Sequence, residues 1–336
     1  MKKIISALLL LVVGFSANTT YAITTLKIAT LSPDGSAWMK QMREGAAEIS
    51  KRTENRVNFK FYPGGVMGDD KAVLKKIRIG QLQGGAVMAG SLASVYKDSQ
   101  VYNAPLIFNN FAEVDYVRSK MDAKIIAGFE KGGFVSFGLA EGGFAYAMST
   151  APLSNPEQLI KNKVWVPSDD NASLEIVRAY DITPIPLGLT DVLAGLQTGI
   201  IDTVATSPIG AIALQWHTQV KYITDIPLVY VYALFVIDQK SFNQLSTADQ
   251  AIVREVMGQK FKTIDQQNRQ DNIAALKALE NQGIKLNQPN SSEVILWKNK
   301  ADIARKRLVE SGEISKESMN EMLNLLQAYR SQQGSK

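Results

Sequence analysis

The chain has 336 residues and a formal net charge of +5, which falls to +3 without Lys2 and Lys3, and its basic residues are dispersed. So small an excess does not favour nucleic-acid binding. The sequence contains no cysteine, which excludes disulfides, thiolate nucleophiles and a lipid-modified N-terminal cysteine.

The first residues have the pattern of a secretory signal. Lys2 and Lys3 precede an apolar run from Ile4 to Phe15, and Thr20-Tyr21-Ala22 offers a small-residue cleavage site. The run is too short to span a bilayer, and no later segment reaches about 18 unbroken apolar residues. We therefore predict a signal peptide at 1–22 and an exported chain of roughly 310 residues, enough to bury a sizeable core.

The region after the signal begins with a repeated order of strands and helices. We expect a strand at 26–30, a loop at 32–36, a helix with Trp38 on its apolar side, a strand at 57–62, a helix opened by Asp69 and Asp70 and ended by Gly80, and a strand at 86–90. The same order returns as a strand at 164–166, a loop at 167–171, a helix through 174–180, a strand at 183–186, a helix capped by Thr190, and a strand at 200–205.

A local echo supports the repeat, because Leu74-x-x-Ile77-x-x-Gly80 matches Leu193-x-x-Leu196-x-x-Gly199. We interpret the two units as related α/β lobes. Loops at the carboxyl ends of parallel strands, with helix N-termini beside them, form a natural ligand rim in each lobe. Two such rims facing each other would define a cleft.

The rest of the chain is predicted to connect and cover these lobes. We expect a crossing strand at 230–237, a long helix at 247–282 and further helices between about 292 and 329. The proposed division assigns 23–146 plus about 230–260 to lobe I, and about 147–229 plus 261–332 to lobe II. No low-complexity linker separates them, so we expect a hinge of strands.

Several segments resemble the solute-binding subunits of tripartite ATP-independent periplasmic (TRAP) transporters, of the dicarboxylate-receptor type. They are LKIAT at 26–30, YPGGVMG at 62–68, IGQL at 79–82, APLIF at 104–108, PL at 152–153, VWVP at 164–167 and DVLAGLQTGIID at 191–202. The resemblance covers nearly the whole mature chain. It implies a two-lobed α/β periplasmic binding protein, of the Venus flytrap type, that closes around a small solute and delivers it to a membrane permease.

The resemblance also implies where a carboxylate would be bound, and this chain departs from the pattern at each place. Trp165 occupies the strand position of the family's usual arginine, and Ala145, within one residue, occupies that of a second arginine. Ser207 stands in place of an asparagine. An indole offers one donor and no charge, so it cannot replace a bidentate arginine. We therefore expect a solute other than a standard dicarboxylate.

We predict an aromatic, largely uncharged site that favours aromatic, alicyclic or other apolar solutes. The expected ligand contacts are Trp165, Phe144, Ser207, Trp216, Trp38, Asp34, Ser91 and Tyr230. Core packing is an equal alternative for Trp38 and Trp216, and a loop cap is an alternative for Asp34. An ammonium group held by aromatic rings and Asp34 is a second ligand type. An organic acid is a further alternative solute, with Arg43, Arg78, Arg118 or Arg178 supplying a displaced base.

The sequence gives little support to catalysis. His217 is the only histidine, and no Gly-x-Ser-x-Gly, Walker-type or complete dinucleotide motif is present. We expect no enzymatic activity, no cofactor and no metal. The alternatives to a transport receptor are an exported ligand sensor or adaptor and, with less support, a periplasmic hydrolase.

Overall fold

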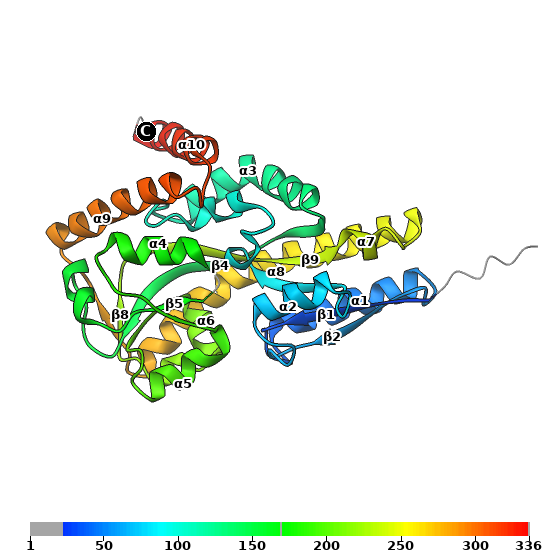
Figure 1. Ribbon diagram of the computed structural model, residues 1–336, viewed down its shortest axis with the longest axis horizontal. Coiled ribbons are helices and arrows are strands. Elements are labelled where there is room, and N and C mark those ends of the chain that lie inside the picture. The colour runs from blue at the N-terminus through cyan, green and yellow to red at the C-terminus, as the bar shows by residue number, and fades with distance from the viewer. Residues whose placement is uncertain (1–22, 169, 335–336) are drawn as a thin grey trace, which may run out of the picture.

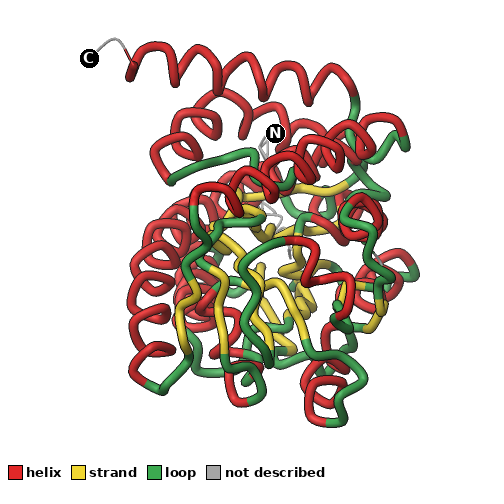
Figure 2. Tube along the Cα trace, turned by 90° about the vertical axis from the view of Figure 1, so that its left-hand side faces the viewer, coloured by secondary structure: helices red, strands yellow, loops and turns green. Residues whose placement is uncertain are grey.

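The computed structural model describes residues 23–168 and 170–334, so the predicted signal peptide at 1–22 lies outside the described residues. Within the described part, no helix is long and apolar enough to cross a bilayer. The molecule has two lobes side by side, one built around β1, β2 and α1 and the other around β5, α5 and α6, with β4, β9 and α8 running between them (Figure 1). Helices surround a central group of strands (Figure 2).

Lobe I is built on five adjacent strands of the main sheet. Its elements are β1 (Thr24–Thr30), α1 (Ala37–Arg52), β2 (Val57–Tyr62), α2 (Asp70–Arg78), β3 (Gly84–Met88), α3 (Phe111–Lys131), the first part of β4 (Phe134–Ser149), β9 (Val229–Asp238) and α7 (Gln239–Phe242). The strand order is β4-β9-β3-β1-β2, with β1 parallel to both β2 and β3. The two helices that follow β1 and β2 begin where the sequence predicts, because Ser36 and Asp69 each accept a hydrogen bond from a first-turn amide.

Lobe II contains shorter strands and helices. They are β5 (Trp165–Pro167), α4 (Asn171–Ala179), β6 (Ile185–Leu187), α5 (Val192–Gln197), β7 (Thr203–Thr206), α6 (Pro208–Ala213), β8 (Tyr222–Thr224) and β10 (Lys285–Asn287). Strands β5 and β6 are parallel, and Val164 makes a parallel bridge to Thr203 of β7. The predicted strands of this lobe exist, but β6 and β7 start two and three residues later than predicted, and the helix at 192 is preceded by a 3-10 turn (Leu189–Asp191).

Two elements physically join the lobes. Strand β4 pairs with β9 from Phe134 to Ala145 and then with β7 and β8 from Tyr146 to Ser149, so a single strand belongs to both sheets. Helix α8 (Thr247–Asn281) has 35 residues, about 50 Å at the usual rise. Its first half is buried in lobe I and its last turns are buried in lobe II. The predicted strand hinge and long crossing helix are confirmed.

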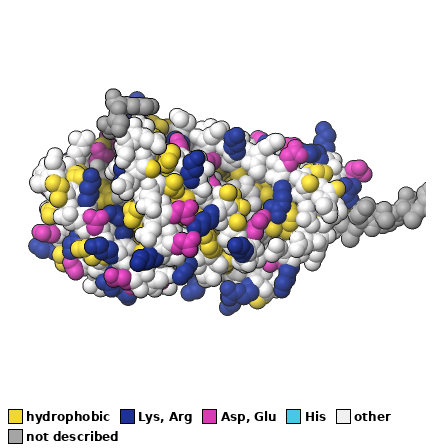
Figure 3. Space-filling view, turned by 90° about the horizontal axis from the view of Figure 1, so that it is seen from above, with side chains coloured by type: hydrophobic (Ala, Val, Ile, Leu, Met, Phe, Trp, Pro, Cys, Tyr) yellow, Lys and Arg dark blue, Asp and Glu magenta, His cyan; other side chains and the backbone are white. Residues whose placement is uncertain are grey.

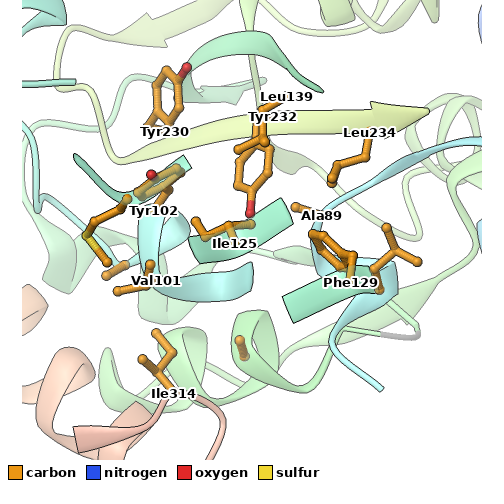
Figure 4. Close-up of a cluster of buried hydrophobic side chains, with 14 of the residues drawn as sticks. Ala89, Val101, Tyr102, Ile125, Phe129, Leu139, Tyr230, Tyr232, Leu234 and Ile314 are labelled. Carbon is orange, nitrogen blue, oxygen red and sulfur yellow. The ribbon is translucent and has the colours of Figure 1, made fainter. Parts of the chain in front are cut away.

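The core of lobe I has an unusually aromatic layer. Figure 4 shows Tyr102, Tyr230 and Tyr232 with Phe129 and aliphatic side chains between β9, β4 and α3. The Tyr232 hydroxyl donates to the Ser99 carbonyl at 2.5 Å, which satisfies a polar atom that is fully buried. The opposite face of the same sheet is covered by α1 and α8. The sheet is therefore buried on both sides.

The last two helices pack on different partners. Helix α9 (Ser291–Glu310) lies on α4, whereas α10 (Lys316–Gly334) packs on α3 and buries Met319, Met322 and Leu326 in the lobe I core. The proposed division placed 261–332 in lobe II. The packing of α10 favours moving that helix to lobe I, and the division itself remains a proposal.

Candidate functional site

The candidate site lies where the carboxyl ends of the parallel strands of the two lobes meet. In lobe I these ends lead into the loops after β1, β2 and β3, and in lobe II into the loops after β5, β6 and β7. A methyl group built at Gly188 of lobe II would lie 3.3 Å from the Asp69 Oδ2 atom of lobe I, and one built at Gly65 would lie 3.6 Å from Thr190 Cγ2. The two rims therefore touch, as in a closed two-lobed receptor.

A second contact between the rims involves Asp170. Its Oδ1 atom accepts hydrogen bonds from Ser173 N, which caps α4, and from Gln100 Nε2 of lobe I at 3.0 Å. A methyl group at Gly90 would lie only 2.9 Å from Asp170 Oδ2. A larger residue at position 90 would therefore displace the Asp170 carboxylate from this contact. The Gln100 Oε1 atom is buried and has no hydrogen-bond partner.

The rim loops are acidic. The segments 31–36, 63–70, 88–91, 167–171, 187–191 and 206–210 contain several aspartates and no Lys or Arg, and the nearest cation along the chain is Lys71. Several described carboxylates have local roles: Asp69 caps α2, Asp170 caps α4, and Asp70 Oδ2 accepts from Met88 N at 2.8 Å. The N-termini of α2 and α4, which would attract an anion, are thus already occupied by carboxylates.

Trp165 is predominantly a packing residue in this structure. Its side chain meets Trp216 edge to face with ring centroids 5.1 Å apart, and its Nε1 donates to the Leu187 carbonyl at 3.1 Å. Trp165 is 7% exposed and Trp216 1% exposed. The predicted alternation is present, because Trp165 packs in one cluster and Val164 in another. Both sides of β5 are covered, so facing away from the valines does not by itself place the ring in open solvent.

Three predicted ligand residues lie on the rims. Ser207 is the N-cap of α6, where its Oγ accepts from Gly210 N. Asp34 lies in the loop after β1 and pairs with Arg43 at 2.9 Å, and the Arg43 hydrogen bond is the main cause that lowers the pKa of this carboxyl. Ser91 follows β3, and its Oγ donates to Asp70 at 3.2 Å. Their places in the rim loops agree with the expected ligand contacts, which stay a prediction.

Three other predicted ligand residues are located in the core. Trp38 packs edge to face against Phe261 of α8 with centroids 5.4 Å apart, so the structure favours core packing for this residue. Phe144 packs on Phe111 at 4.8 Å and is 5% exposed. Tyr230 is 1% exposed. These aromatic side chains fill the two core layers on either side of the lobe I sheet, and they do not lie on the rims.

Tyr230 instead belongs to a buried ionic cluster at the strand hinge. Its hydroxyl donates to Glu141 Oε2 at 3.2 Å and accepts from Arg118 at 3.1 Å, and burial raises the pKa of the hydroxyl well above its usual value. Glu141 is fully buried and pairs with Arg269 of α8 at 2.6 Å. Hydrogen bonds from Arg269 to Asp115 and Glu141 raise the pKa of its guanidinium. The cluster joins α3, β4 and α8.

Sequence reasoning did not identify Gln100, Gly90 or the hinge cluster. Gln100 lies in a 3-10 segment with no distinctive local pattern, and its partner Asp170 is 70 residues away. Glu141 and Arg269 are separated by 128 residues. The loop at 167–171 alone carried a sequence signal, an N-cap pattern in which aspartates precede a helical stretch.

The two touching rims, the shared strand and the crossing helix define a hinged receptor for a small solute. The chain belongs to the DctP family, the bacterial extracellular solute-binding proteins of family 7, which it matches over residues 28–311. The TRAP solute-binding family and the two-lobed fold are confirmed, whereas the dicarboxylate-receptor subtype stays a prediction.

Individual relatives agree with this assignment. The sialic acid-binding periplasmic protein SiaP of Vibrio cholerae is 20% identical over 294 residues, 86% of this chain and 89% of that protein. The sugar acid binding protein DctPAm of Advenella mimigardefordensis, solved with galactonate, has a TM-score of 0.84 at 19% identity and covers 91% of this chain and 99% of its own. A TRAP periplasmic solute binding protein of Xanthobacter autotrophicus, solved with β-D-galacturonate, has a TM-score of 0.81 at 16% identity, covering 90% and 99%.

Proposed function

We propose that the chain is the periplasmic receptor of a TRAP transporter and captures a small organic solute between the two rims. Closure of the lobes around the solute then creates the surface that a membrane permease recognises. Binding favours the closed conformer only through contacts that the open conformer lacks, so residues from both rims must touch the solute. The receptor works by capture and release, without bond chemistry.

We further propose that this solute has an aromatic or apolar body and is not a standard dicarboxylate. The observation that carries this proposal is the absence of Lys and Arg from all six rim loops, together with the carboxylates already present there. Burying a carboxylate without a charged or multiply hydrogen-bonded partner costs several kcal/mol. Trp165 does not supply such a partner, because its only donor is bonded to the Leu187 carbonyl.

The test is a thermal-shift screen of the mature chain, followed by calorimetry on every hit. The panel contains succinate and malate, galactonate and galacturonate, aromatic acids, neutral aromatics and amines. We expect stabilisation by neutral aromatic or alicyclic compounds and none by the dicarboxylates. Tight binding of succinate or malate would overturn the proposal for the solute while leaving the receptor function in place.

An organic-acid receptor is the second candidate, because the solved relatives named above hold sugar acids. Of the arginines considered from the sequence, Arg118 is bonded within the hinge cluster, and Arg178 pairs with Glu175 at the surface. Arg43 pairs with Asp34, a residue of a rim loop. If galactonate binds and Arg43→Ala abolishes that binding while Arg178→Ala does not, Arg43 is the displaced base and the solute is an anion.

The transport role separates this receptor from an exported sensor. Adding the mature chain to proteoliposomes that contain a TRAP permease from the same organism should drive uptake of the solute found in the screen. Solute binding with no dependence of uptake on the chain would favour the sensor or adaptor.

A further inference from the structure

The hinge strand is irregular at two places, and the second lies next to lobe II. The pairing of β4 with β9 shifts register between Glu141 and Gly143, which leaves Gly142 as an extra residue. Gly143 has a φ of +87°, a conformation that a residue with a side chain adopts only with strain. A methyl group at Gly143 would also lie 2.7 Å from the Asn272 amide nitrogen. This bulge is located just before the strand passes from the lobe I sheet into the lobe II sheet.

Four polar side chains on one face of α8 form hydrogen bonds to this bulge. Asp265, Asn268, Arg269 and Asn272 are spaced at i, i+3, i+4 and i+7, which places them on one face of the helix. Each contacts residue 141 or 142 of β4: Asp265 accepts from Glu141 N at 2.7 Å, Asn268 donates to Glu141 O at 2.7 Å, Arg269 pairs with the Glu141 carboxylate, and Asn272 donates to Gly142 O at 2.9 Å.

Asn272 differs from the other three in also bonding lobe II. Its Oδ1 atom accepts from Ile209 N at 3.1 Å, in the first turn of α6. The other three hydrogen-bond to β4 or α3. Asn272 is 5% exposed, so neither bond is readily replaced by water. The turn that it holds begins at Ser207, which lies on the lobe II rim.

We propose that Asn272 is a positioning residue for solute capture, which ties the hinge bulge of β4 to the rim end of α6. The bond to Ile209 links the hinge-facing side of α8 to α6 in a conformer whose rims touch, and we take this bond to be lost when the lobes open. An interaction present in only one of two conformers shifts the equilibrium toward that conformer. Asn272 thereby sets the population of the closed, solute-binding conformer in the free receptor. This inference rests on the proposed capture by lobe closure.

The absence of cysteine makes the hinge directly measurable. Spin labels on cysteines introduced at Lys51 of α1 and Gln197 of α5, both exposed, report the distance between the lobes of the full mature chain. The distances are measured first without solute, so failure of the solute screen leaves this test intact. Far-UV circular dichroism verifies folding of each variant.

The comparison is Asn272→Ala against the matched control Asn268→Ala, which removes the same side chain one turn earlier and cuts a bond to β4 only. We expect Asn272→Ala to add a longer-distance population, and Asn268→Ala to overlap the parent chain. Once a solute is known, its apparent Kd should rise for Asn272→Ala in proportion to the closed population lost. Equal distributions for the two variants, or no change in either, would overturn the proposal.

A second variant removes the same bond from the other side. Ile209→Pro deletes the N–H that donates to Asn272 Oδ1, at the second position of α6, where Ser207 caps a different amide. Because proline disfavours helical geometry in the residue before it, circular dichroism must first show that this variant is folded. It should reproduce the longer distances even if Asn272→Ala fails to fold. Unchanged distances in a folded Ile209→Pro variant would equally refute the tie.

Discussion

Replacing Trp165 by alanine tests whether this residue is core or ligand contact. The indole is 7% exposed, stacks edge to face on Trp216 and donates one hydrogen bond to the Leu187 carbonyl. A buried Trp→Ala change costs about 3–5 kcal/mol through lost burial and the cavity that remains. Within that sum, the hydrogen bond accounts for about 1 kcal/mol. The edge-to-face pair accounts for about 0.5–1.5 kcal/mol.

Guanidinium unfolding followed by far-UV circular dichroism measures the loss, because that signal does not depend on tryptophan fluorescence. Trp165→Phe is the graded control: it keeps an aromatic ring against Trp216 and removes the N–H, so we expect a cost of about 1–2 kcal/mol. The double variant with Trp216→Ala should show a coupling energy of about 0.5–1.5 kcal/mol between the two rings.

A core role and a ligand-contact role for Trp165 predict different combinations of unfolding cost and loss of solute affinity in Trp165→Ala. A ligand contact with little packing would give an unfolding cost below about 1 kcal/mol and a loss of solute affinity of at least about 1 kcal/mol. A core residue gives the large unfolding cost instead. A small unfolding cost for Trp165→Ala would therefore refute the packing argument.

Three further predictions concern the rest of the molecule. Arg269→Ala should cost about 3–5 kcal/mol in urea unfolding, because it leaves a fully buried carboxylate unpaired, and a cost below about 1 kcal/mol would contradict that burial. The hydrogen bond from Arg56 is the main cause that lowers the pKa of Asp249, so its stabilisation is present above the unfolded value near 3.9 and is lost as the pH falls through the lowered value. Asp249→Asn should consequently lose less unfolding free energy than the parent chain between about pH 5 and pH 2, and parallel pH curves would count against the pair. Gly90→Ala should weaken solute binding by wedging a methyl group against Asp170 across the rims, and calorimetry that finds an unchanged Kd would show that the rims need not approach so closely.

Local sequence signals were sufficient for the order of the elements and for most helix starts. Ser36 and Asp69 cap their helices as expected because an N-cap depends on a side chain and an amide only three residues apart. The strands at 26–30 and 57–62 and the long helix at 247–282 were predictable from periods of two and 3.6 residues, which report the side of an element that is buried. The family, in contrast, was indicated by the resemblance of the motifs between 26 and 202 to those of known solute-binding subunits.

Only the tertiary structure decided what lies against each buried side. Alternation in β5 places Trp165 opposite Val164, but it carries no information on whether that side meets a cleft or a second core layer, and here both sides are covered. The pair of Glu141 and Arg269 joins residues 128 positions apart, a contact that no local period reports. The sequence by itself thus determined the order of the elements and, through its family motifs, a two-lobed solute-binding protein. The packing of strand, helix and hinge decided which aromatic residues are core and which polar ones connect the lobes.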